Sequence, residues 1–183
     1  MSLNKTVVIV GMMGSGKTAV GKALASELNV SFMDSDNEIS AAANRSITEI
    51  FERDGEAFFR SAESKVIERL LKGPACVLST GGGAFMSGEN RRLISKLGVS
   101  VFLDVNLELL WERVRNKESR PLLKTLNPKE TLSKIFEDRK DQYHLADLSI
   151  VVNYSCSIMQ TMQDVLASLR KWPDVMIARG DCP

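Results

Sequence analysis

The sequence predicts an α/β fold in which a five-stranded parallel sheet carries helices on both faces. Short β-branched and apolar runs alternate along the chain with longer segments whose apolar residues recur at helical spacing. The first apolar run leads into a glycine-rich loop and then into a helix, which is the order of a nucleotide-binding unit. The 183 residues are 44% hydrophobic and 26% charged, as in an ordinary globular protein. We therefore expect residues 1–183 to form one domain.

The expected elements follow from these runs in chain order. Strands are predicted at residues 6–10, 30–33, 76–79, 99–103 and 148–152. Helices are predicted at residues 19–28, 39–43, 47–53, 55–71, 87–97, 107–114, 129–145 and 158–169. Ser46 and Glu49 have the spacing of a capping box at the start of one of these helices. Residues 115–128 are polar with few apolar anchors, so we expect a loop there, and residues 172–183 show no clear periodicity.

The bulk composition excludes several classes of protein. The net charge is +1 and the pI is about 7.7, which argues against a broad nucleic-acid-binding face. The three cysteines form no C-x-x-C pair, so neither a zinc site nor a disulfide framework is expected. No apolar run approaches the roughly 20 residues of a membrane span, and no targeting pattern opens the chain. We expect a cytoplasmic protein without a nucleic-acid or membrane partner.

Residues 11–18 read GMMGSGKT and match the phosphate-binding loop G-x-x-x-x-G-K-[ST]. Loop N–H groups and the following helix N-terminus supply positive potential for phosphates. Lys17 would reach the β- and γ-phosphates of ATP, and the Thr18 hydroxyl would ligate Mg²⁺. The expected nucleotide contacts in this segment are Gly14, Ser15, Gly16, Lys17, Thr18 and Ala19.

Two further predicted strands also end in residues suited to a ligand. Asp34 and Asp36 follow the second strand, and three glycines at residues 81–83 follow the third. Since the carboxyl ends of parallel strands meet at one edge of a sheet, these segments should share a cleft with the phosphate loop. One carboxylate could bind magnesium through water while the other holds a hydroxyl nucleophile. Alternatively, Asp36 caps a helix, and the glycines form a tight turn that needs positive φ.

Taken together, the motifs resemble those of the shikimate kinase family. The matching residues are 11–18, Phe32-x-Asp34-x-Asp36, 46–51, 55–63, 79–83, 120–123, Arg139 and Tyr143. The resemblance spans about residues 6–158. It implies a P-loop fold of the nucleoside-monophosphate kinase type, with strand order 2-3-1-4-5, a substrate-binding segment at about 34–63 and a lid at about 115–128. The implied reaction transfers the γ-phosphate of ATP, with Mg²⁺, to the 3-hydroxyl of shikimate on the route to chorismate and the aromatic amino acids.

The resemblance also implies a role for each site residue. Asp34 would lie in the outer shell of the metal ion, and Asp36 would orient or deprotonate the attacking hydroxyl. Arg60 and Arg139 would hold the shikimate carboxylate. The remaining implied residues are Gly81, Gly82 and Gly83 lining the substrate pocket, Arg120 closing over the phosphates from the lid, and Arg113 along the adenine. Lys17, Asp36 and Arg120 would form the catalytic set, in a monomeric enzyme.

Several of these residues also have plainer interpretations. Arg60 and Glu63 are three apart and could be a surface ion pair, while Arg139 lies in a charge-rich run typical of a solvated face. Arg113 and Arg120 could be surface arginines without a role. At the level of function, a gluconate or aminoshikimate kinase and a non-enzymatic nucleotide-binding module are the alternatives. The intact Lys17, Asp36 and Arg120 argue against the module.

Overall fold

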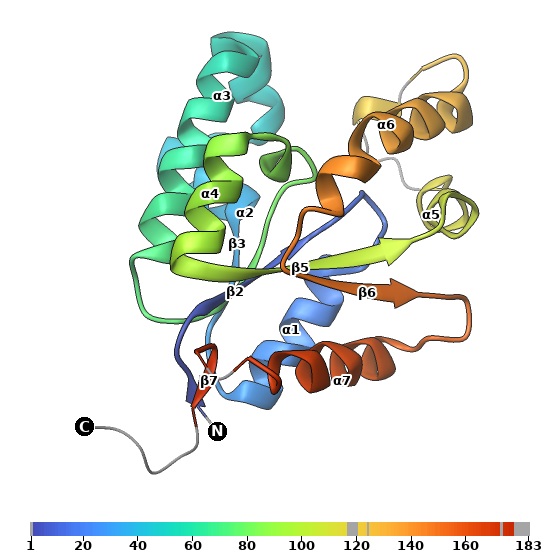
Figure 1. The fold of residues 1–183 in the computed structure, drawn as a ribbon. Helices are drawn as coiled ribbons and strands as arrows, with labels where there is room; N and C mark the ends of the chain where they lie inside the picture. Colours follow the sequence, from blue (N-terminus) through green and yellow to red (C-terminus); the bar gives the residue numbers. More distant parts are fainter. Residues whose placement is uncertain (1, 117–120, 124, 173, 178–183) are drawn as a thin grey trace.

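In the computed structural model, which describes residues 2–116, 121–123, 125–172 and 174–177, a parallel sheet crosses the centre of the molecule (Figure 1). Its strands are β2 (Thr6–Val10), β3 (Phe32–Asp34), β4 (Val77–Ser79), β5 (Gly98–Val105) and β6 (Leu148–Val152). They lie in the order β3-β4-β2-β5-β6, and every neighbouring pair is parallel. An additional short strand precedes β2, so this order is the predicted order 2-3-1-4-5, which is confirmed.

The central strand β2 forms the middle of the hydrophobic core. All five of its residues are buried, as expected for a strand covered on both faces. In register, Val8 pairs with Leu78 of β4 on one side and with Ser100 of β5 on the other. This burial fixes the position of the loop that leaves the carboxyl end of β2.

Helices cover both faces of the sheet. They are α1 (Lys17–Leu28), α2 (Ser35–Ala43), α3 (Ile47–Leu71), α4 (Gly88–Leu97), α5 (Leu107–Val114), α6 (Pro128–Tyr143) and α7 (Ile158–Leu169), with short 3₁₀ turns η1 (Ala84–Met86) and η2 (Pro121–Leu123). Helices α1 and α7 pack together on one face, while α3 and α4 lie side by side across the sheet from them (Figure 1). The expected α/β architecture is therefore confirmed.

Helix boundaries differ from the prediction where a cap or a glycine decides them. Helix α2 begins at Ser35 rather than at residue 39, because the Asp34 side chain caps it by accepting from the backbone N–H groups of Asp36 and Asn37. The two predicted helices 47–53 and 55–71 are both present within the span α3, which non-helical backbone interrupts at Gly55, where φ is 81° and ψ is 171°. The predicted capping box at the start of α3 is confirmed.

The ends of the described chain form a second, two-stranded sheet that the sequence analysis missed. Strand β1 (Ser2–Leu3) pairs antiparallel with β7 (Met176–Ile177). The segment predicted to lack periodicity thus contains a strand, but one of two residues is too short to show alternation. Among the described residues, no helix combines the length and apolar character needed to cross a membrane.

Candidate active site

The phosphate loop joins β2 to α1 and depends on glycine backbone geometry. Gly11, Gly14 and Gly16 all have positive φ, at 143°, 82° and 97°. A Cβ on Gly14 would lie 2.6 Å from the Val114 side chain, so α5 packs directly against the loop. Helix α1 has no side-chain hydrogen bond at its N-cap, Gly16, and no acidic residue in its first turn. No side-chain cap therefore competes with an anion for the first N–H groups of this helix.

The polar side chains of this loop also suit a phosphate ligand. Lys17 Nζ donates to the carbonyl oxygens of Gly11 and Met12, at 2.8 and 2.9 Å, so its ammonium group lies over the loop. Ser15 is buried, and its hydroxyl has no hydrogen-bond partner in the structure. Thr18 and Ala19 are exposed in the first turn of α1. Arg113 is held beside the loop, where its Nη1 donates to the Gly14 carbonyl at 3.3 Å.

The two aspartates after β3 have different structural positions. Asp34 Oδ1 accepts from the N–H groups of Asp36 and Asn37, at 3.1 and 3.4 Å. Asp34 is thus the helix cap, and the alternative that Asp36 caps α2 is wrong. Asp36 lies in the first turn of α2, where a Cβ on Gly81 would be 2.7 Å from its Oδ1 and 3.2 Å from Glu63 Oε1. Both carboxylates therefore reach the glycine loop because residue 81 has no side chain.

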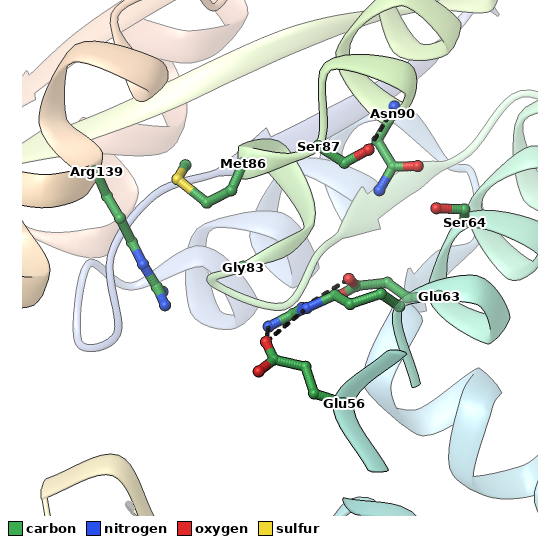
Figure 2. A pocket seen from close by; sticks show the side chains of 9 residues that line it. Glu56, Glu63, Ser64, Gly83, Met86, Ser87, Asn90 and Arg139 are labelled. Atoms are coloured by element: carbon green, nitrogen blue, oxygen red, sulfur yellow. Dashed lines mark hydrogen bonds and ion pairs between the residues drawn. The ribbon is translucent and has the colours of Figure 1, made fainter. Parts of the chain in front are cut away.

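Arg60 is held by two acidic residues of its own helix, α3, namely Glu56 and Glu63, which are labelled in Figure 2. Its Nη1 lies 2.8 Å from Glu63 Oε2, and its Nη2 lies 3.2 Å from Glu56 Oε1. Because Glu63 is only 1% exposed, the interpretation of this pair as a plain surface contact is wrong. Burial lowers the pKa of Arg60, but hydrogen bonds and charge from Glu63 and Glu56 outweigh it and raise that pKa overall. The pKa of Glu63 is raised overall, chiefly by burial, although hydrogen bonding and charge from Arg60 oppose the rise.

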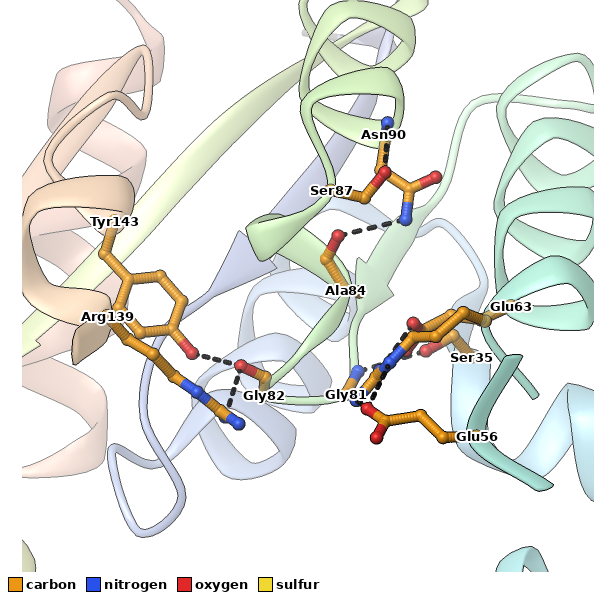
Figure 3. A network of polar contacts seen from close by, with 11 residues as sticks. Ser35, Glu56, Glu63, Gly81, Gly82, Ala84, Ser87, Asn90, Arg139 and Tyr143 are labelled. Atoms are coloured by element: carbon orange, nitrogen blue, oxygen red, sulfur yellow. Dashed lines mark hydrogen bonds and ion pairs between the residues drawn. The ribbon is translucent and has the colours of Figure 1, made fainter. Parts of the chain in front are cut away.

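The glycines at residues 81–83 follow β4, and Figure 3 shows Gly81 and Gly82 between the side chains of Arg139 and Glu63. The Gly81 N–H donates to Ser35 Oγ at 3.1 Å, and the Gly82 carbonyl accepts from Arg139 Nη1 at 3.0 Å. A Cβ on Gly83 would lie 2.6 Å from both terminal nitrogens of Arg60. None of the three glycines has positive φ. The interpretation of the segment as a turn that needs positive φ is therefore wrong, and glycine is required for space at residues 81 and 83.

Arg60 and Arg139 line one cavity, although they come from helices far apart in the sequence (Figure 2). The cavity has a volume of about 340 Å³, within the range of small-molecule sites. Its lining residues are Glu56, Arg60, Glu63, Ser64, Gly83, Met86, Ser87, Asn90 and Arg139. The bond from Arg139 to the glycine loop shows that Arg139 does not belong to a solvated face, so that alternative is wrong.

A family model for shikimate kinase matches residues 13–170. The chain belongs to the shikimate kinase family. It is 58% identical to a shikimate kinase of Ruegeria pomeroyi over 96% of this chain and 90% of that protein, and 57% identical to one of Cereibacter sphaeroides over 95% and 87%. A solved shikimate kinase from Acinetobacter baumannii, in complex with shikimate, has a TM-score of 0.85 at 35% identity, covering 91% of this chain and 93% of that one.

As a shikimate kinase (EC 2.7.1.71), the protein phosphorylates the 3-hydroxyl of shikimate in the pathway to chorismate and the aromatic amino acids. A gluconokinase from Sinorhizobium meliloti shares the fold, with a TM-score of 0.58, but is only 19% identical over 93% of this chain and 94% of that one. Because the chain belongs to the shikimate kinase family, the alternatives of a gluconate kinase and a non-enzymatic module are set aside. The predicted family and activity are confirmed.

Part of the segment predicted as a lid, residues 115–128, lies outside the described residues. Arg120 lies outside the described residues, and so do residues 117–119 and 124. Within the described part of the segment, η2 forms and Leu123 is buried against the core. The polar loop predicted from its sparse apolar residues thus contains one apolar anchor.

Several residues that contact the predicted site were not among its predicted members, and Glu56, Tyr143 and Asn90 are three of them. Glu56 lies four positions before Arg60, and Tyr143 lies four positions after Arg139, which is the spacing of neighbours on one helical face. That spacing was the available signal in both cases. Asn90 is buried in α4, and its side-chain amide donates to the Ala84 carbonyl at 2.9 Å. Nothing in the local sequence indicates that α4 faces the cavity.

Proposed function

We propose that the cavity lined by Arg60 and Arg139 holds shikimate, with its carboxylate between the two guanidinium groups. The observation that carries this proposal is the convergence of the two arginines, from α3 and α6, on one cavity. Guanidinium groups offer paired N–H donors that match the two oxygens of a carboxylate. The similar structure from Acinetobacter baumannii holds shikimate.

The ring hydroxyls would then face Gly81, Gly82, Gly83 and Asp36. Asp36 orients the 3-hydroxyl and accepts its proton while the hydroxyl oxygen attacks the γ-phosphorus of ATP. The bond from that phosphorus to the bridging oxygen breaks, so ADP leaves with the electron pair. Since phosphoryl transfer depends mainly on positioning and charge stabilisation, the close approach of Asp36 to the glycine loop supports this role.

ATP would bind with its phosphates in the loop of residues 14–19. Lys17 exchanges its bonds to loop carbonyls for bonds to phosphate oxygens, and the first N–H groups of α1 face the same charge. We place Arg113 along the adenine, since it already lies beside the loop. Arg120 would approach the transferring phosphate from the lid. Lys17, Asp36 and Arg120 are the proposed catalytic set.

Mg²⁺ fits the residues around the loop when phosphates are present. Among the described residues, no group of three or more histidine, cysteine or acidic side chains could hold a metal ion. The phosphate loop therefore offers a metal ion few protein ligands. Magnesium suits a site of this kind, because it keeps several waters and binds through few protein ligands together with phosphate oxygens. Thr18, exposed at the start of α1, would hold the ion, and Asp34 would contact its water shell. The bound ion would neutralise charge on the β- and γ-phosphates.

We further propose one domain over residues 1–183, with a substrate segment at about 34–63 and a lid at about 115–128. The enzyme would act as a monomer in the cytoplasm. The thiols of Cys76 and Cys156 are free, which is typical of a reducing compartment. The partners would be shikimate and ATP, without nucleic acid or membrane.

The decisive experiment replaces Arg60 by lysine and measures steady-state kinetics for both substrates. Arg60→Lys keeps the charge but loses the paired donors, so the KM for shikimate should rise roughly 10–100-fold while the KM for ATP changes little. A shikimate analogue without its carboxylate should bind the variant and the wild type equally poorly.

Arg69→Lys is the matched control, because Arg69 lies on the same helix and pairs with Glu38 at the surface, 2.7 Å away. It should leave both KM values unchanged. If Arg60→Lys impairs the carboxylate-free analogue as strongly as shikimate, Arg60 does not bind the carboxylate.

A further inference from the structure

Two donors on α6 share one acceptor in the substrate loop (Figure 3). Arg139 Nη1 and the Tyr143 hydroxyl both donate to the carbonyl oxygen of Gly82. Arg139 and Tyr143 are four residues apart, so their side chains project from the same face of the helix. A carbonyl oxygen has two lone pairs, and these two bonds use both of them.

The position of the Tyr143 hydroxyl is fixed by aromatic packing. The side chain is 1% exposed, and its ring stacks on Phe102 of β5 with the ring centroids 5.2 Å apart. Phe85 of η1 lies on the ring as well, at 6.4 Å and nearly parallel. Burial raises the pKa of Tyr143 to about 12, with a smaller opposing effect from Arg139. The hydroxyl therefore keeps its proton and remains a donor throughout the working range of pH.

Arg139, in contrast, is half-buried and lines the cavity, and its bond to Gly82 uses one of the five N–H donors of the guanidinium. A guanidinium that turns to present paired donors to a substrate carboxylate would weaken that bond. A carbonyl that loses its only donor in a partly buried loop is destabilised, because leaving it unpaired costs more than the bond itself contributes. The second donor removes that penalty.

We propose that Tyr143 is a positioning residue that keeps the Gly82 carbonyl bonded, so that Arg139 can turn to the substrate carboxylate. This inference rests on the proposed role of Arg139. Without the phenolic hydroxyl, Gly82 competes with the substrate for Arg139. A turn of Arg139 toward the substrate would then leave the Gly82 carbonyl without a donor, so binding of the carboxylate weakens.

The first test compares Tyr143→Phe with wild type in steady-state kinetics. The phenylalanine keeps the aromatic stack and removes only the hydroxyl, so the KM for shikimate should rise about 2–12-fold, the factor expected from one neutral hydrogen bond. The kcat at saturating shikimate and the KM for ATP should stay within twofold. Tyr154→Phe is the control, since Tyr154 is the other tyrosine and is exposed beyond β6. Equal rises in both KM values, or a fall in kcat alone, would overturn the proposal.

A double-mutant cycle with Arg139→Met separates this inference from the proposed function. If Arg139→Met alone leaves shikimate affinity unchanged, the carboxylate role of Arg139 fails. If Arg139→Met weakens shikimate binding, Tyr143→Phe added to it should cause no further loss, because no competing arginine is left. Full additivity of the two losses would show that Tyr143 acts independently of Arg139 and would refute the inference. Thermal unfolding of each variant checks that the fold is kept.

Discussion

Replacing Gly83 by alanine tests how closely the glycine loop packs beneath the substrate-binding arginine. The added Cβ would lie 2.6 Å from Nη1 and from Nη2 of Arg60, whereas ordinary contact begins at 3.4 Å. Gly83 has φ of −101° and ψ of −15°, which alanine adopts without strain. The flexible end of Arg60 must therefore withdraw by roughly 1 Å while the backbone stays in place. Misplacement by that amount can reduce turnover about 100-fold.

We expect Gly83→Ala to lower kcat/KM for shikimate by roughly 10–100-fold, because the displaced guanidinium loses charge-assisted bonds to the carboxylate. The KM for ATP should be unaffected. A coupled ADP-release assay with shikimate, and with the carboxylate-free analogue, measures both effects. Gly88→Ala is the matched control, since a Cβ there meets only Arg91, at an ordinary 3.6 Å. Wild-type kcat/KM in the folded Gly83→Ala variant would refute the steric argument.

Three further outcomes are expected. Lys17→Ala should reduce turnover by roughly 10²–10³-fold with an unchanged circular dichroism spectrum, and near wild-type turnover would contradict the loop assignment. Asp36→Asn should lower kcat far more than it weakens ATP binding, whereas lost ATP affinity at constant kcat would place Asp36 in the nucleotide site. Burial raises the pKa of Tyr143 from 10.0 to about 12, so the folded protein keeps a proton that the unfolded chain releases. The contribution of Tyr143 to the free energy of unfolding should therefore be fully present below pH 10, and about 2–3 kcal/mol of it should be lost as the pH rises to 12. Between pH 10 and pH 12, the free energy of unfolding measured with urea should fall less for Tyr143→Phe than for the wild type. Equal falls in both proteins would contradict the raised pKa of Tyr143.

The sequence was sufficient for the sheet and the phosphate loop because both leave strong local patterns. The apolar run of β2 and the loop glycines are contiguous, and the loop needs positive φ at fixed positions. The alternation of strands and helices then placed the ligand site at the carboxyl ends of the strands. Arg60 and Arg139 were predicted to hold the carboxylate from the family resemblance, and no local pattern shows that their helices converge.

Local sequence could not decide questions that depend on packing between elements. Asp34 and Asp36 are both good caps, and only the backbone geometry after β3 makes Asp34 the cap. The glycines at residues 81–83 left a turn open as an alternative, because the space requirement at Gly81 and Gly83 comes from Asp36, Glu63 and Arg60 on other elements. The bond of Tyr143 to Gly82 joins residues 61 positions apart. No periodicity encodes such a contact.

The pairing of β1 with β7 has a consequence for how this enzyme can be attached to a surface or to another protein. One further hydrogen bond extends this pairing, because the backbone N–H of Asn4 donates to the Val175 carbonyl oxygen at 2.9 Å. The two-stranded sheet lies at the amino end of β2, whereas the phosphate loop leaves the carboxyl end of the same strand. A tether joined beside β1 or beside β7 would therefore start from the edge of the sheet opposite the phosphate loop. Immobilisation through either strand should leave the approach of shikimate and ATP open.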